Sequence, residues 1–424
     1  MAPAVFSALF LGLLTVVTGF RLWLGRRQAR HLQRQRAFVP LAFRDAVTPE
    51  EHARSVDYTR ARLRVAGFQT LTHALVIAGL TTGGGLEALR GLWLGTGWPP
   101  LLTGSALLLS LAGALGLVGL PFAAYGTFVV EARFGFNRTR PGLFLWDGLR
   151  QAAISGLFLG VLAAGLLGLM SWVTVWWLWA WLLWLAFSLL LTWAYPRWIA
   201  PLFNRFQPLA EPELRRRVEG LLARCGLSLS GIRVMDASRR TAHGNAFFTG
   251  VGSAKRVVLY DTLLDTLAPA EVEAVLAHEL GHYRLGHIRR GLVLSGVAGL
   301  AALALLAWLR GQPWFFQGLG VAEPADAAAL GLFALAGPVF AFPLQPLLAA
   351  RSRQWEVQAD AFAVRYSDGR ALERALVKLF RDNASPLAPD PLYARFHYSH
   401  PPPQARLERL AKVVAQGAKG PHPG

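Results

Sequence analysis

Seven long apolar runs constrain the fold of this 424-residue chain more than any other feature. Each run has about the length of 20 residues that an α-helix needs to cross the hydrocarbon core of a bilayer. One such run could be a buried core helix, but seven predict a mostly α-helical, polytopic membrane protein. The fourth and fifth runs are nearly fused, which leaves a count of six open. The runs cover residues 4–24, 68–88, 101–125, 151–170, 172–195, 291–310 and 327–349.

Positive charge is unevenly distributed between the connections, although the net charge is +18. Arginines gather after alternate runs: Arg26, Arg27, Arg30, Arg34 and Arg36 after the first, Arg133, Arg138 and Arg140 after the third, and Arg197 and Arg205 after the fifth. The opposite connections carry little beyond Arg90 and Arg310. By the positive-inside rule, the C-terminus and the long 196–290 segment are predicted to be cytoplasmic.

The same charge bears on the partners of the chain. No aromatic and basic recognition motif accompanies it, so we expect no nucleic acid partner. The basic segment from Arg26 to Arg36 is instead expected to face anionic headgroups of the lipid bilayer.

The runs divide the chain into four predicted parts. Residues 1–195 form an N-terminal membrane region with cytoplasmic loops at 25–67 and 126–150, and 196–290 form a cytoplasmic catalytic insert. Residues 291–349 form a transmembrane hairpin, and 350–424 a cytoplasmic C-terminal segment. Within the insert we expect a helix at 211–225 and strands at 232–235, 246–249 and 256–260, which predicts a zincin-like α+β unit.

The insert ends in the pattern HExxH, from His278 to His282. Pro269 and the helix-forming residues after it predict a helix through this motif. Side chains four apart lie on one face of a helix, so His278 and His282 can hold one metal ion while Glu279 lies beside its open position. The motif predicts one Zn²⁺ per chain, with Glu279 as the base that activates a water molecule.

The third ligand is predicted from topology. The single Cys225 excludes a cysteine cluster, so nitrogen and oxygen must bind the metal. The last two runs form a hairpin whose cytoplasmic ends converge, and Glu356 follows the second of them. If the helix is continuous from His282 into the sixth run, the metal lies about 14 Å from the apolar boundary.

The alternative ligand is His287, which does not match the metzincin spacing. On a continuous helix it lies about 140° around from His282 and faces away from the metal. We therefore interpret His287 as a residue that supports the site without binding the metal.

Six motifs, in order along the chain, resemble the Ste24-type CAAX prenyl proteases, which are membrane zinc metalloendopeptidases of the M48 family. Together with seven runs they make the resemblance specific over most of the chain. The motifs are FGFNR at 134–138, PLFNRF at 201–206, GNAFFTG at 244–250, HELGHYRLGH at 278–287, SRQWEVQAD at 352–360 and HYSHPP at 397–402.

The resemblance implies zinc ligands at His278, His282 and Glu356, a catalytic base at Glu279, and seven helices that enclose a chamber. It further implies roles for residues elsewhere in the chain. The strand that begins with Asn245, Ala246 and Phe247 would bind the substrate backbone, and His400 and Arg406 would lie near the scissile carbonyl.

Four positions can also be interpreted from the residues alone. His400 or Arg406 could donate to the oxyanion that peptide hydrolysis produces. Asn245 could equally be a turn residue of a plain β-hairpin. Asp360, four residues after Glu356, could accept a hydrogen bond from a ligand histidine and so fix the orientation of its ring.

These features predict an integral membrane zinc metalloendopeptidase that hydrolyses peptide or protein substrates without a covalent intermediate. The alternative is a non-enzymatic scaffold or transporter that retains a protease fold. The residues do not show whether a substrate is prenylated or membrane-embedded, and membrane protein quality control is equally compatible. The Arg-rich, Lys-poor composition indicates a GC-rich bacterial source, so we expect a multi-pass protein of the bacterial inner membrane with a cytoplasmic active site.

Overall fold

The computed structural model covers residues 1–424 and describes all of them except 228–230, 250–255 and 418–424. Seven helices of the described part are long and apolar enough to cross a membrane. This confirms the predicted mostly α, polytopic fold, with seven spans. The spans are Pro3–Gln35 (α1), Pro49–Leu80 (α2), Pro100–Glu131 (α4 and the π-helix η2), Pro141–Trp172 (α5), Trp176–Phe203 (α6, η3 and α7), His287–Arg310 (α11) and Asp326–Tyr366 (α13, η6 and α14).

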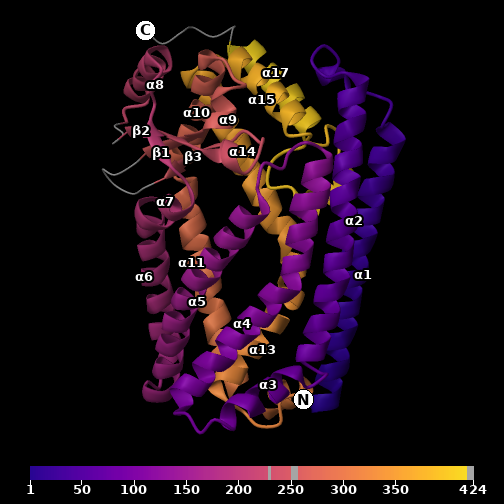
Figure 1. The fold of residues 1–424 in the computed structure, drawn as a ribbon, viewed down its shortest axis with the longest axis vertical. Helices are drawn as coiled ribbons and strands as arrows, with labels where there is room; N and C mark the ends of the chain where they lie inside the picture. Colours follow the sequence, from indigo (N-terminus) through magenta and orange to yellow (C-terminus); the bar gives the residue numbers. More distant parts are fainter. Residues whose placement is uncertain (228–230, 250–255, 418–424) are drawn as a thin grey trace.

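The spans run along the long axis of the molecule, and the small sheet lies at the end opposite the N-terminus (Figure 1). Two short helices, Gly85–Leu94 (α3) and Pro313–Gly318 (α12), lie at the N-terminal end. There a core of fully buried side chains that includes Phe10, Phe316 and Leu332 packs α1, α12 and α13 together. Apolar packing therefore closes the bundle at this end.

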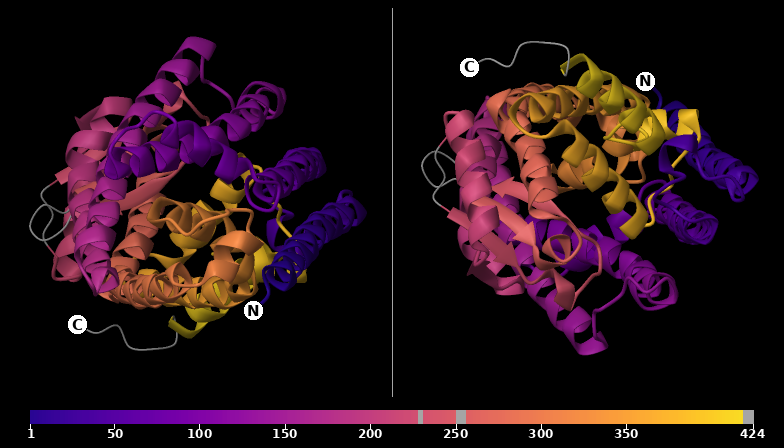
Figure 2. Two further views of the ribbon diagram at one scale, coloured as in Figure 1. Left: turned by 90° about the horizontal axis from the view of Figure 1, so that it is seen from below. Right: turned by 90° about the horizontal axis from the view of Figure 1, so that it is seen from above.

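Seen along the long axis, the helices are arranged around a centre (Figure 2). A cavity of about 570 Å³ lies between α2, η2 and the segment from Asn383 to Tyr398. It shares Tyr398 with a cavity of about 420 Å³ that His278 and Glu279 line. The predicted chamber is thus present, and it reaches from the membrane helices to the HExxH motif.

The two predicted cytoplasmic loops, 25–67 and 126–150, are largely helical. In the 25–67 segment, α1 continues to Gln35 and α2 starts at Pro49, so that only residues 36–48 connect them. Thr48 and Glu51 form a capping box that fixes the start of α2. α1 continues beyond its apolar run because the basic segment that follows consists of good helix formers.

The insert contains a four-stranded sheet in the order β1-β2-β4-β3. Strands β2 (Gly231–Met235), β3 (Ala246–Thr249) and β4 (Arg256–Tyr260) agree with the prediction, and β2 and β4 are parallel. Strand β1 (Phe206–Pro208) was not predicted, because a three-residue edge strand that ends in Pro has no period to detect. β3 is the other edge of the sheet.

Helices cover one face of this sheet and extend to the C-terminus. Leu221, Leu259, Leu276 and Leu372 are fully buried in their common core. The helices are Pro212–Arg224 (α8), Asp261–Leu264 (α9), Pro269–Arg284 (α10), Gly369–Asp382 (α15) and Pro403–Gly417 (α17), whereas Pro391–His397 (α16) packs against α14 and α1.

The HExxH helix is not continuous with the sixth span, contrary to the expectation from sequence. α10 ends at Arg284 and α11 begins at His287, with Gly286 in the left-handed region at φ +71°. A residue with a Cβ atom adopts this conformation only at a cost, so Gly286 permits the break. The helix is therefore interrupted between the two histidines of the motif and the sixth span.

α10 lies directly against α14, and Gly281 is the point of closest approach. A Cβ atom at Gly281 would lie 3.1 Å from Ala359 Cα and 3.1 Å from Phe362 Cβ. Both neighbours are close to the backbone of α14 and cannot rotate away. The small residue inside HExxH thus sets the distance between the two helices.

We predict that Gly281→Ala lowers the thermal stability of the purified protein, because the added methyl group costs about 1–3 kcal/mol of overpacking. Gly291→Ala is the matched control, since its Cβ would meet the Trp355 ring at an ordinary 3.7 Å. Thermal unfolding in detergent compares the two. Equal melting temperatures for the two variants would contradict this account of the α10–α14 contact.

Candidate metal centre

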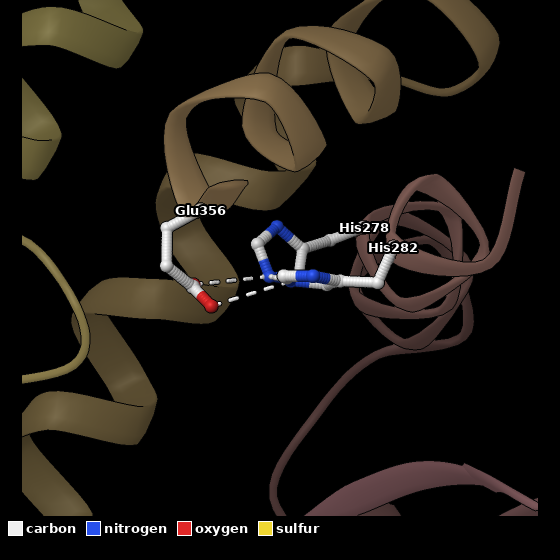
Figure 3. Close-up of side chains that lie close together, drawn as sticks. All are labelled: His278, His282 and Glu356. Carbon is white, nitrogen blue, oxygen red and sulfur yellow. Dashed lines mark hydrogen bonds and ion pairs between the residues drawn. The ribbon is translucent and has the colours of Figure 1, made fainter. Parts of the chain in front are cut away.

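Three side chains from two helices form a compact triangle, whose corners are two imidazole nitrogens and one carboxylate group (Figure 3). His278 Nε2 lies 3.2 Å from His282 Nε2 and 3.4 Å from Glu356 Oε2, and His282 Nε2 lies 3.3 Å from Glu356 Oε1. The histidines come from α10 and the glutamate from α14. The contact at Gly281 therefore brings together side chains that are 74 residues apart in the chain, from His282 to Glu356.

The triangle fits a small tetrahedral metal ion. Ligand atoms at about 2.0–2.1 Å from such an ion lie about 3.3 Å from one another. Glu356 Oε2 is buried and forms no hydrogen bond of good geometry with a described residue, although His400 Nδ1 lies 2.6 Å away. A buried carboxylate oxygen in this situation is suited to a cation.

Asp360 lies behind His278, on the side away from the triangle. His278 Nδ1 lies 2.8 Å from Asp360 Oδ1, and the Arg406 guanidinium donates to both Asp360 oxygens at 2.7 and 2.9 Å. Burial by itself lowers the pKa of His278, but Asp360 and Glu356 outweigh it and raise this pKa to about 9. The contact leaves the Nε2 atom of His278 free to face the other two donors.

His287 supports His282 in a similar way. Its Nδ1 atom lies 3.1 Å from His282 Nδ1, and its Nε2 atom lies 2.9 Å from Gln358 Oε1. The ring also stacks on Trp355. The break at Gly286 turns His287 toward His282, so the expected angle of 140° on a continuous helix does not apply. His287 is not in the donor triangle. The contact of Gln358 with His287 was not predicted, because its only signal in the sequence is its place in the motif around Glu356.

Glu279 and His400 line the 420 Å³ cavity next to the triangle. Burial raises the pKa of the Glu279 carboxyl group. The His400 side chain is 60% exposed, and its Nδ1 atom contacts Glu356. Both side chains can therefore reach a molecule bound in the cavity.

Arg406 also lines the cavity but is held differently. It is only 6% exposed, and its guanidinium is engaged with Asp360 while its Nη2 atom lies 3.6 Å from Glu356 Oε2. The structure thus places Arg406 against the supports of the triangle rather than as a free donor.

The strand predicted to bind substrate is only partly at the site. Asn245 and Ala246 line the same cavity as Glu279, and one edge of β3 has no partner strand among the described residues. Successive side chains of a strand point to opposite faces. Phe247 accordingly lies on the other face of the sheet, near Tyr260, and lines a different cavity.

The chain is similar to known proteins over most of its length. Residues 28–205 match the family described as CAAX prenyl protease N-terminal, five membrane helices, and residues 208–414 match peptidase family M48. The CAAX prenyl protease 1 homolog of Arabidopsis thaliana is 35% identical over 312 residues, which cover 72% of this chain and 71% of that protein. The human homolog is 32% identical over 334 residues, which cover 69% of this chain and 70% of that protein.

A solved structure extends the similarity to the fold. The crystal structure of S. mikatae Ste24p superimposes with a TM-score of 0.89 at 26% identity, and the match covers 96% of this chain and 99% of that one. The alternative of a non-enzymatic scaffold or transporter is therefore set aside. The chain belongs to peptidase family M48, and it is an integral, multi-pass membrane metallopeptidase of the CAAX prenyl protease type.

Proposed function

We propose that the metal is zinc, one ion per chain, bound by His278, His282 and Glu356. The observation that carries this proposal is the triangle of two imidazole nitrogens and one carboxylate, in which the nitrogens lie 3.2 Å apart and each lies 3.3 or 3.4 Å from one of the two carboxylate oxygens. Two histidines and a glutamate are a common ligand set of catalytic zinc, which leaves a fourth position open. Glu279 lies beside that position.

Zinc bound there would supply a Lewis acid that activates water and polarises the scissile carbonyl. Glu279 accepts the proton of the attacking water and passes it to the leaving amine. Its buried position raises its pKa, which makes the carboxylate a stronger base. Peptide hydrolysis then proceeds without a covalent intermediate.

The two residues near the carbonyl take different roles in this proposal. His400 has an exposed ring at the cavity and donates to the developing oxyanion. Arg406 is a positioning residue, because it holds Asp360 through two hydrogen bonds and Asp360 in turn orients His278. The unpaired edge of β3 adds the substrate as a further strand, with Asn245 and Ala246 nearest the metal and Phe247 contributing only its backbone.

The substrates that we propose are peptides or proteins delivered from the membrane, including prenylated C-a-a-X sequences. The name CAAX prenyl protease 1 of the relatives supports this class. Apolar side chains such as Leu63, Val65 and Val130 line the 570 Å³ cavity, which could accept an isoprenyl chain.

We place the active site on the cytoplasmic side of a bacterial inner membrane. The arginine-rich end of α1 lies at the same end of the molecule as α10 (Figure 1). Under the positive-inside rule both then face the cytoplasm. Functionally, residues 1–195 and 291–349 serve as the membrane chamber, 196–290 as the insert with HExxH, and 350–424 as the segment with the third ligand.

Glu279→Gln is expected to keep its zinc but to lose peptide cleavage by a factor of about 10²–10⁴, the usual contribution of a general base. Metal quantitation and a peptide-cleavage assay on purified protein measure the two effects. A variant that cleaves as fast as the wild type, or wild-type protein without zinc, would exclude the proposed mechanism.

Asp360→Asn is expected to weaken zinc binding or activity about 10–100-fold, because an amide has one acceptor oxygen and no charge, and so cannot hold both His278 and the Arg406 guanidinium in place. Glu408→Gln, an exposed carboxylate on α17, is the control and should behave as wild type. Competition with a zinc chelator gives the affinities. Unchanged zinc affinity and activity in Asp360→Asn would refute the positioning role.

A farnesylated C-a-a-X peptide is expected to be cleaved with a kcat/KM at least about tenfold above that of the same peptide without the lipid. Burial of only two additional CH₂ groups in the chamber contributes about 1.6 kcal/mol, which is sufficient for this ratio. Equal values for the two peptides would indicate general proteolysis of membrane proteins instead, with the zinc mechanism unaffected.

A further inference from the structure

A third cavity, of about 500 Å³, lies on the face of the sheet that points away from the metal centre. Four arginines line it, two from the sheet and two from the end of the fifth span: Arg233, Arg256, Arg197 and Arg205. Phe247 and Val258 contribute an apolar surface. The mechanism proposed above uses none of these side chains.

The alternation of β2 and β4 explains how two arginines reach this face. Ile232 and Val257 pack into the core under α8 and α10. Their neighbours Arg233 and Arg256 must therefore project from the opposite face, where Val258 and Phe247 form a small apolar cluster. Both arginines are only partly exposed, so their charge is held at the cavity and not in open solvent.

No described carboxylate neutralises the four arginines. Arg197 donates to the Trp193 carbonyl and lies over the Trp193 ring, and only the backbone of Arg205 contacts Asp236. The undescribed ranges 228–230, 250–255 and 418–424 contain no Asp or Glu. The cavity thus combines four positive charges with an apolar surface, and it lacks a counter-ion from the described side chains.

The position of the cavity indicates that an anion bound by these arginines would come from the membrane. α7 lies between α6 and the sheet, so that the cavity is at the end of a membrane span (Figure 1). Trp193 and Trp198 at this end are both exposed, and their rings pack edge to face. Exposed tryptophans at the end of a span are typical of the depth of the lipid headgroups.

We propose that this cavity binds the phosphate headgroup of an anionic phospholipid. Arginine side chains form paired hydrogen bonds with phosphate, and basic pockets at the ends of membrane helices bind anionic headgroups. The apolar surface of Phe247 and Val258 contacts the glycerol and the first acyl carbons. The bound lipid joins the sheet, and with it the β3 edge, to the surface of the bilayer.

The test uses the full-length protein in phosphatidylcholine nanodiscs that contain a photoreactive phosphatidylglycerol. Crosslinked peptides are identified by mass spectrometry. We expect labelling within residues 195–208 and 231–260. Each arginine near a headgroup contributes about 1 kcal/mol, or about fivefold, so Arg233→Gln with Arg256→Gln should reduce this labelling by more than tenfold.

Two further variants keep the test decisive. Arg216→Gln with Arg409→Gln removes the same charge from exposed positions on α8 and α17, at the end of the molecule far from the spans, and should label as wild type. Arg205→Gln changes an exposed side chain, so the variant should fold as the wild type does. Its labelling should fall about fivefold.

The proposal is overturned if a photoreactive phosphatidylcholine labels the same peptides equally well, or if the control pair loses as much labelling as the cavity pair. It is also overturned if excess inorganic phosphate abolishes the labelling, because the site would then bind free anions rather than lipid.

Discussion

The close contact between α10 and α14 is the interaction on which the metal centre depends. Gly281 has no side chain, so the backbone of α14 approaches α10 to within 3.1 Å of where a Cβ atom would lie. At that separation, the imidazoles of His278 and His282 and the carboxylate of Glu356 are close enough to share one ion. The glycine within HExxH therefore has a packing role, besides the chemical roles that we propose for the histidines and the glutamate.

Buried charge around the centre is arranged so that each group has an opposite partner. Glu356, Asp360 and Arg406 are all buried, and removal of one member of such a set would leave the others uncompensated. The chain Arg406–Asp360–His278 brings a positive charge from α17 to the back of a histidine on α10. The C-terminal helix is in this way part of the centre, although it lies more than 120 residues after the HExxH motif.

The sheet separates two environments. One face packs on the helices that hold the metal centre, and its β3 edge opens to the same cavity as Glu279. The other face presents arginines and Phe247 at the end of the fifth span. A strand whose side chains alternate can serve both environments at once, which explains why adjacent residues of β3 have unrelated surroundings.

The local patterns of the sequence were sufficient for much of this protein. Seven apolar runs predicted the seven spans, because a bilayer imposes its length on any helix that crosses it. The spacing of His278 and His282 predicted a shared face, because the helix period is local, and the convergence of two spans was enough to select Glu356.

Tertiary structure decided the orientation of side chains that depends on how distant helices and strands pack against one another. The turn at Gly286 places His287 behind His282, the hydrogen bonds of Asp360 hold Arg406 against the supports of the metal site, and strand alternation turns Phe247 away from the metal. A sequence fixes which side chains exist and how far apart they are along the chain. The contacts that orient them arise only when distant segments pack, because each orientation is set by neighbours that the local pattern does not contain.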